Sequence, residues 1–306
     1  MQDILIILGC ISCGMLSGFW QRRNAPLMRA ADTVSLYAVY GLLFILGARL
    51  GADQELLSRL PVLGGRALCI AFCCTAASAL GMTALRRWFG NEAAPRSGHG
   101  YAGPSPLTGS LRILCAFSAG ILLALPGLTP GFLNDSAFAA YALYLLVFAV
   151  GIGLGADLKA FRIVRDLHLK ILAVPLCIVA GSAVGALLAG LILPGVSFRD
   201  SLCVGWGLGY YSLSSILIEN SGNSSLASVA LLANILREIM AILFAPLLSR
   251  HLGRLSPVGA AGATAMDTTL PVIARFSGEH YAVIAVFSGM TLTLLVPFLV
   301  TAALRI

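Results

Sequence analysis

The chain has 306 residues, of which 58% are apolar and only 11% carry a charge, and its mean hydropathy is +0.92. Ordinary soluble domains carry about 25% charged residues, so this composition excludes that class and predicts an integral membrane protein. The formal net charge of +7 comes mostly from arginines in short segments between apolar stretches. That distribution indicates membrane orientation rather than nucleic-acid binding.

Eight apolar segments are each long enough to cross a bilayer as a helix, which takes about 20 residues. A transmembrane barrel would instead show short segments of alternating polarity. The predicted fold class is therefore an all-α membrane protein. The eight predicted spans are 3–20, 33–51, 65–84, 108–125, 136–155, 171–193, 226–248 and 281–303.

Basic residues mark alternate loops between these spans. They follow the first, third and fifth spans, as in "WQRRNAPLMR" (20–29), whereas the segment 126–136 after the fourth span has none. Cytoplasmic loops carry the excess of lysine and arginine in membrane proteins. We therefore expect the N-terminus and the C-terminus to lie outside the cytoplasm.

The first six spans contain an internal repeat. The segment "YGLLFILGARLGAD" (40–53) aligns without a gap with "YLLVFAVGIGLGAD" (144–157), 104 positions later, and the alignment continues to pair Ser78 with Ser182. Each copy contains three spans, an odd number, so the copies lie upside down relative to each other. Inverted repeats are typical of secondary transporters.

The repeat also predicts how the chain is divided. The transport unit is expected to have the order hairpin, helix, hairpin, helix, which is similar to the elevator type of glutamate transporter by analogy of arrangement alone. The predicted units are an inverted-repeat scaffold, residues 1–195, with copies at 1–84 and 108–193, and a substrate-binding transport unit, residues 196–306.

Two segments after the sixth span are too polar and too rich in glycine for helices that face lipid, namely 196–224 and 252–279. Irregular backbone at membrane depth is tolerated only where protein buries it or where it lines water. We expect two re-entrant hairpins or broken helices, the first dipping in from outside and the second from the cytoplasm. Ten full crossings are the alternative.

Ionisable side chains occur near the middle of span 226–248, at Arg237 and Glu238. A charge at a span centre costs about 2.5–3.5 kcal/mol on insertion scales and is functional by default. Asn234 lies one helical turn before Glu238, on the same face. The alternative interpretation is structural, with Arg237 in a buried ion pair with Glu219 or Asp267.

These features predict one substrate site built from the two hairpins and span 226–248. Carboxylates suit an amine, tyrosines can stack on a cation, and hydroxyls and helix N-termini suit a carboxylate. The expected ligand is a zwitterionic or cationic amino acid. The predicted site residues are Tyr210, Tyr211, Ser212, Ser214, Glu219, Asn220, Asn234, Arg237, Glu238, Asp267, Thr268 and Thr269.

The sequence resembles the lysine exporter LysO family. The resemblance is densest between about 203 and 303, in "GYYSLSSILIENSG", "LANILREIMAILFAPLL", "GATAMDTTLPVIARFSG" and "LTLLVPFLV". It implies export of L-lysine across the bacterial inner membrane, eight spans, both termini outside, and intramembrane acidic residues that act in transport. Glu238, in "REI", matches such a position, and Asp32 is a second candidate, for which a helix cap is an equally good interpretation.

The predicted function is secondary active export of L-lysine, and possible homo-oligomers and close analogues of lysine stay open. No phosphate-binding loop for ATP occurs, so an ion gradient is the expected driver. A carboxylate such as Glu238 can hold lysine's ammonium or a proton, which predicts antiport with protons or sodium and no other cofactor. Export of another amino acid or small solute, or a uniporter or channel, are the alternatives.

An intramembrane enzyme is disfavoured. Such an enzyme needs a nucleophile beside a base, and all four histidines lie in loops or at span ends. The eight cysteines fall almost wholly within apolar spans and indicate packing rather than a metal or redox site.

Overall fold

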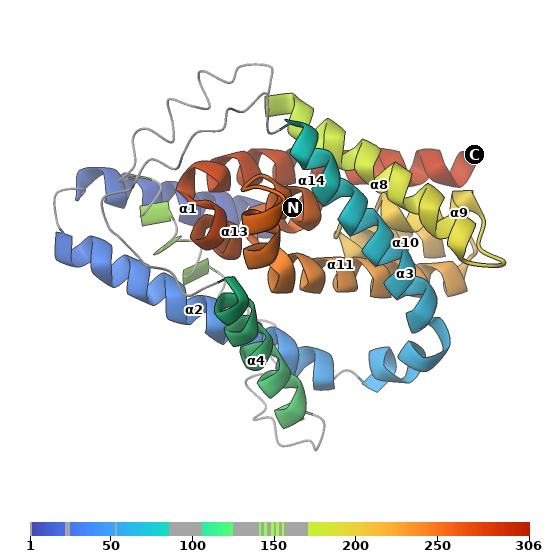
Figure 1. Ribbon diagram of the computed structural model, residues 1–306, viewed down its shortest axis with the longest axis horizontal. Coiled ribbons are helices and arrows are strands. Elements are labelled where there is room, and N and C mark those ends of the chain that lie inside the picture. Colours follow the sequence, from blue (N-terminus) through green and yellow to red (C-terminus); the bar gives the residue numbers. More distant parts are fainter. Residues whose placement is uncertain are drawn as a thin grey trace.

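A computed structural model describes residues 2–21, 25–52, 54–85 and 106–124, single positions between 141 and 155, and all of 171–306. Every regular element of these residues is a helix, which confirms the all-α class (Figure 1). Four helical segments are long and apolar enough to cross a membrane, namely Leu63–Leu85, Ala173–Ile192, Ser224–His251 and Glu279–Arg305. The predicted span 136–155 falls largely outside the described residues, so the total of eight crossings stays a prediction.

The N-terminal half supplies α1 to α4 and α8, and the C-terminal part supplies two long helices, α11 and α14, with two broken segments between or before them. The helices are α1 (Gln2–Trp20), α2 (Ala25–Ala52), α3 (Gln54–Leu85), α4 (Pro106–Ala124), α8 (Ala173–Ile192), α9 (Phe198–Gly205), α10 (Tyr211–Glu219), α11 (Ser224–His251), α12 (Ser256–Ala261), the 3₁₀ turn η2 (Gly262–Met266), α13 (Leu270–Ser277) and α14 (Glu279–Arg305).

Helices α3 and α8 cross in close contact because small residues line the crossing. A Cβ atom added to Gly185 would lie 2.4 Å from the Cα atom of Cys74, and one added to Gly181 would lie 2.7 Å from the Cα atom of Ser78. Larger side chains would force the two backbones apart. Small residues at such positions are how helices in lipid gain packing contacts.

Helices α1 and α2 also contact residues of the segment 108–193, which the sequence predicts to be the second copy of the repeat. A Cβ atom on Gly47 of α2 would lie 2.1 Å from the carbonyl oxygen of Phe117 in α4. Likewise, one on Gly18 of α1 would lie 2.0 Å from the carbonyl oxygen of Ile152. The described parts of residues 1–84 and 108–193 therefore pack closely against each other.

The first broken segment is α9 and α10, which are separated by residues 206–210. At its start, Arg199 donates to the carbonyl oxygen of Leu304 at the end of α14. At its middle, the carbonyl oxygen of Val204 accepts from Asn234, in the middle of α11. Helix α10 then leads straight into the start of α11 at Ser224.

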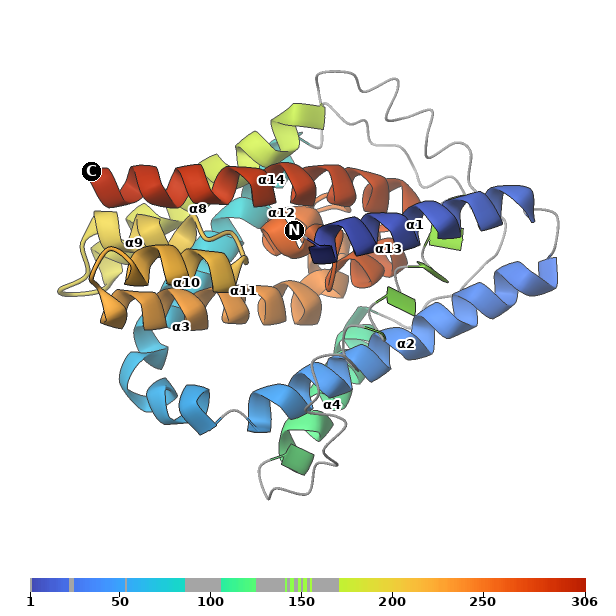
Figure 2. The same ribbon diagram turned by 180° about the vertical axis from the view of Figure 1, so that it is seen from behind.

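The second broken segment is α12, η2 and α13, and it follows the end of α11. The carbonyl oxygen of Ala260 accepts from Arg237 in the middle of α11. The segment then returns, since Ser249 near the end of α11 donates to the carbonyl oxygen of Phe276. Each broken segment thus returns to the end of the bundle from which it started, and the two start from opposite ends (Figures 1 and 2).

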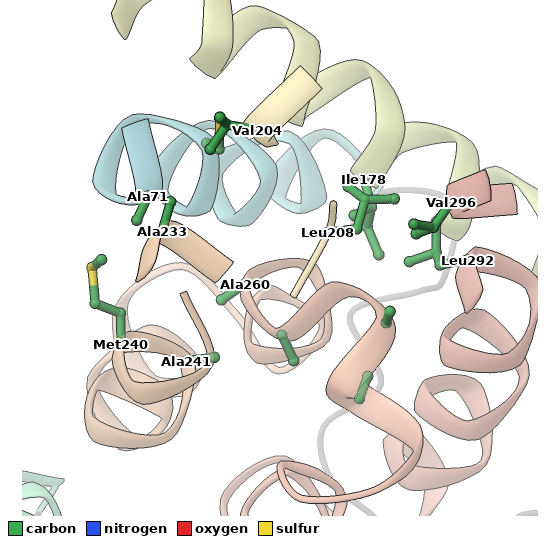
Figure 3. Close-up of a cluster of buried hydrophobic side chains, with 14 of the residues drawn as sticks. Ala71, Ile178, Val204, Leu208, Ala233, Met240, Ala241, Ala260, Leu292 and Val296 are labelled. Carbon is green, nitrogen blue, oxygen red and sulfur yellow. The ribbon is translucent and has the colours of Figure 1, made fainter. Parts of the chain in front are cut away.

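The core lies where α3, α8, α11, α14 and the broken segments meet, and it is built largely from alanine and other small apolar side chains. Figure 3 shows part of it, where Val204 of α9, Ala71 of α3 and Ala233 of α11 lie close together. This packing places the innermost residues of both broken segments against the middle of α11.

Candidate functional site

The two broken segments touch at their innermost residues. The carbonyl oxygen of Leu208 accepts a hydrogen bond of 2.9 Å from the backbone N–H of Ala263, which we call the tip contact. Leu208 has a φ of 53° and Gly262 a φ of 67°, a region that L side chains rarely adopt. A Cβ atom on Gly262 would lie 2.4 Å from the carbonyl oxygen of Leu208, so the tip contact requires glycine there.

Asn234 of α11 holds the first broken segment. Its Oδ1 atom accepts from the N–H of Gly209 at 2.8 Å, and its Nδ2 atom donates to the carbonyl oxygens of Val204 at 3.1 Å and Ala230 at 2.9 Å. The side chain is 2% exposed. A buried amide whose nitrogen and oxygen are both bonded to backbone groups has a structural role in holding that segment.

Arg237, one turn further along α11, holds the second broken segment. Its Nε atom donates to the carbonyl oxygen of Ala260 at 3.0 Å, and its Nη2 atom donates to that of Gly259 at 3.2 Å. Both carbonyls belong to the last turn of α12, where the helix dipole favours a positive charge.

The other donors of Arg237 reach hydroxyls of the α3–α8 crossing. Nη1 donates to Ser182 at 2.8 Å and Nη2 to Ser78 at 3.3 Å. The guanidinium is 1% exposed, and no carboxylate pairs with it in the part of the chain that the structure describes. The interpretation as a structural residue agrees with these contacts, whereas an ion pair with Glu219 or Asp267 does not.

Glu238 faces a different set of neighbours. Its carboxyl group lies near Asp267 and Thr268, within the range over which their charges and dipoles interact. Asp267 in turn accepts from the N–H and, at 3.2 Å, from the hydroxyl of Thr268. We call Glu238, Asp267 and Thr268 the carboxylate cluster.

The carboxylate cluster lies at the start of α13, whose dipole favours negative charge. Glu238 is 8% exposed, and across the described residues no basic side chain forms an ion pair with Glu238 or Asp267. Buried carboxylates are normally paired with a cation or neutralised by a proton. The arrangement can therefore hold an ammonium group, a proton or a small monovalent cation.

The remaining predicted residues are spread over the first broken segment and its surroundings. Ser214 is fully buried and bonded to the carbonyl oxygen of Tyr211 at 3.2 Å and to Asn234 at 3.4 Å. Tyr210 is half-buried, and Tyr211 and Ser212 are exposed. Ser214 is hydrogen-bonded to the middle of α11 through Asn234.

Two of the predicted residues lie at the end of α10, away from the carboxylate cluster, and a third belongs to α2. Glu219 and Asn220 are exposed at the far end of α10, about 12 Å along the helix from its first residue. Asp32 lies seven residues inside α2, which begins at Ala25, so it does not cap that helix as the alternative proposed. Thr269 is buried and donates to the carbonyl oxygen of Thr264 at 2.8 Å, which is a backbone role.

Ser78 and Ser182 were not among the predicted site residues. The repeat alignment pairs them, but it carries no information about where span 226–248 packs. Their contact with Arg237 depends on residues 55 and 159 positions away in sequence.

Comparison with known proteins gives consistent results. A family model described as "Lysine exporter LysO" matches residues 8–101 and 114–304. A protein of Escherichia coli (strain K12), named "Lysine exporter LysO", is 37% identical over 195 residues, which is 62% of this chain and 62% of that protein. A "Putative lysine exporter" of Haemophilus influenzae is 32% identical over 162 residues, 52% of this chain and 80% of the other. No solved structure matches.

Proposed function

We propose, because this chain belongs to the lysine exporter LysO family, that it exports L-lysine from the cytoplasm as a secondary transporter. The alignment spans 62% of the E. coli relative, so the activity is a proposal for this chain. The observation that carries it is the carboxylate cluster, where the buried Glu238 lies near the half-buried Asp267 and neither has a basic partner among the described residues.

The carboxylate cluster has the chemistry to select a basic amino acid. An ammonium group is a compact cation with three donors, and the cluster offers carboxylate and hydroxyl oxygens as acceptors. An apolar or anionic solute would leave the two carboxylates uncompensated at a large desolvation cost. Lysine, ornithine and similar diamino acids are the expected substrate class.

Export is proposed to be coupled to inward movement of a proton or a sodium ion. Lysine is a net cation, and moving one positive charge outward against the membrane potential costs about 2.3 kcal/mol per 100 mV. Exchange for one cation removes this cost. The carboxylate of Glu238 can hold the ion on the way in and the lysine ammonium on the way out, but not both together.

The proposed setting is the bacterial inner membrane, with eight crossings, both termini outside, residues 1–195 as scaffold and residues 196–306 as the transport unit. Two exposed positions test the hairpin arrangement in a cysteine-free background, Ser225→Cys in the first turn of α11 and Arg254→Cys between α11 and α12. A membrane-impermeant thiol reagent added outside intact cells should label position 225 and not 254. Labelling of both would support ten crossings.

The function is tested by counterflow in proteoliposomes that contain the purified protein. Vesicles loaded with unlabelled lysine should accumulate labelled lysine. Control vesicles loaded with leucine instead should not. Accumulation driven by leucine or another neutral amino acid would contradict the proposed substrate class.

The coupling is tested by imposing one gradient at a time on the same vesicles. A proton gradient, or failing that a sodium gradient, should drive lysine in the direction opposite to the ion. If membrane potential alone drives lysine while neither gradient has an effect, the protein is a uniporter.

A further inference from the structure

The α3–α8 crossing contains a pair of equivalent residues in direct contact. Ser78 and Ser182 are 104 positions apart, the same offset as the copies beginning at residues 40 and 144. Their hydroxyl oxygens lie 3.0 Å apart. In any arrangement with two-fold symmetry, a residue that touches its own equivalent lies at the axis.

Two further contacts near this serine pair are equivalent to each other, because swapping the two repeat copies turns one into the other. A Cβ atom on Gly81 would lie 3.0 Å from the sulfur of Cys177, and one on Gly185 would lie 2.5 Å from the carbonyl oxygen of Cys73. Adding 104 to 81 gives 185, and adding 104 to 73 gives 177, so each pair is the other with the two copies swapped. Two neighbouring sets of contacts thus obey the same pseudo-two-fold relation.

Arg237 lies beside this axis and binds both serines, but unequally. The distance from Nη1 to the Ser182 hydroxyl is 2.8 Å, and that from Nη2 to the Ser78 hydroxyl is 3.3 Å. The same guanidinium holds the carbonyls of Gly259 and Ala260 in the second broken segment. Arg237 is therefore the side chain through which the crossing of the two copies contacts the segment that carries Asp267.

We propose that Arg237 is a positioning residue that acts as the pivot of alternating access, by exchanging its shorter hydrogen bond between Ser182 and Ser78. The proposal rests on the transport function proposed above. In transporters with inverted repeats, the two copies exchange conformations between the inward-open and outward-open states. Ser182 is the closer partner in the described state, so Ser78 becomes the closer partner in the other.

The serine variants test this exchange, since Arg237→Ala can fail to fold. Ser182→Ala disfavours the described state, and Ser78→Ala disfavours the opposite state. The readout is the ratio of the half-saturation constants for lysine on the two faces of uniformly oriented proteoliposomes, because that ratio follows the equilibrium between the two empty states. We expect shifts of about tenfold in opposite directions, the value of one hydrogen bond to a charged group.

Ser288→Ala in α14 is the matched control, because Ser288 is buried and its hydroxyl has no hydrogen-bond partner among the described residues. It should leave the ratio unchanged. If Ser78→Ala and Ser182→Ala move the ratio in the same direction, or leave it unmoved, the pivot is wrong while lysine transport by the unmodified protein still stands. Absence of lysine flux in the unmodified protein would overturn the proposed function as well.

Discussion

Side chains in the middle of α11 differ in how they bond to the protein around them. Asn234 and Arg237 are buried and make hydrogen bonds to backbone carbonyls and hydroxyls of the broken segments and the α3–α8 crossing. Glu238, the residue after Arg237, instead lies near Asp267 and Thr268. The difference is between two side chains that hold the broken segments in place and a carboxylate that has no basic partner among the described residues.

Glu238→Gln is expected to give the largest functional effect, because it changes the carboxylate cluster and leaves the fixing residues intact. Removing one partner of a buried charged interaction costs about 2–5 kcal/mol, which is about 30-fold or more in affinity. Lysine counterflow should fall below detection, while the amount of folded protein in the membrane stays near that of the unmodified chain.

Glu219→Gln is the matched control for that change, since Glu219 is an exposed carboxylate at the far end of α10. Its counterflow should be unaltered. Near-normal transport by Glu238→Gln would mean that Glu238 is structural. Glu238 would then not differ in role from Asn234 and Arg237.

Gly262→Ala changes the tip contact between the two broken segments rather than the carboxylate cluster. It should reduce stability more than any other substitution proposed here. Alanine at a φ of 67° is strained by about 1–2 kcal/mol. Its Cβ atom would also lie 2.4 Å from the carbonyl oxygen of Leu208, and overpacking of this kind costs about 1–3 kcal/mol. The melting temperature in detergent should fall.

Gly195→Ala separates these two causes. Gly195 has a φ of 78°, but nothing lies within 4 Å of an added Cβ atom. Its variant should show the backbone strain alone, so its melting temperature should lie between those of the unmodified protein and Gly262→Ala. Equal melting temperatures for the two variants would show that the tip contact contributes no stability of its own.

The difference between polar side chains that bond to protein and the carboxylates of the cluster explains which features the sequence could predict. Glu238 and Asp267 are conspicuous because charge is rare in this chain, and the glycine-rich segments are conspicuous because lipid cannot hydrogen-bond irregular backbone. Asn234 and Ser214 are polar residues of the same kind, yet they bond to backbone groups of the first broken segment. Whether a buried polar group binds protein or ligand depends on tertiary contacts that periodicity does not encode.

Thr268→Val tests whether the hydroxyl of the carboxylate cluster matters for binding. A hydrogen bond to a charged group is worth about 1.5–3 kcal/mol, so the KM for lysine should rise about tenfold or more. Folding should be unaffected, since among the described residues this hydroxyl donates to the carboxylate of Asp267 and to no backbone group.

Thr291→Val is its control, because Thr291 is a half-buried residue of α14 whose hydroxyl donates to the carbonyl oxygen of Phe287, within the same helix. It should leave KM unchanged. An unchanged KM in Thr268→Val, with the control also unchanged, would place lysine outside the carboxylate cluster.

Ser214→Ala should have the smallest effect, although the sequence marks Ser214 as a site residue. Its hydrogen bonds are long, at 3.2 Å to the carbonyl oxygen of Tyr211 and 3.4 Å to Asn234. The amide of Asn234 keeps shorter bonds to Val204 and Ala230 when the hydroxyl is removed, so no buried donor is left without an acceptor. The expected cost is about 1 kcal/mol or less in stability, with counterflow near normal. The contradicting result would be loss of counterflow in Ser214→Ala at an unchanged melting temperature. The hydroxyl would then have to turn toward lysine in another state of the transport cycle, and the first broken segment would carry part of the substrate site.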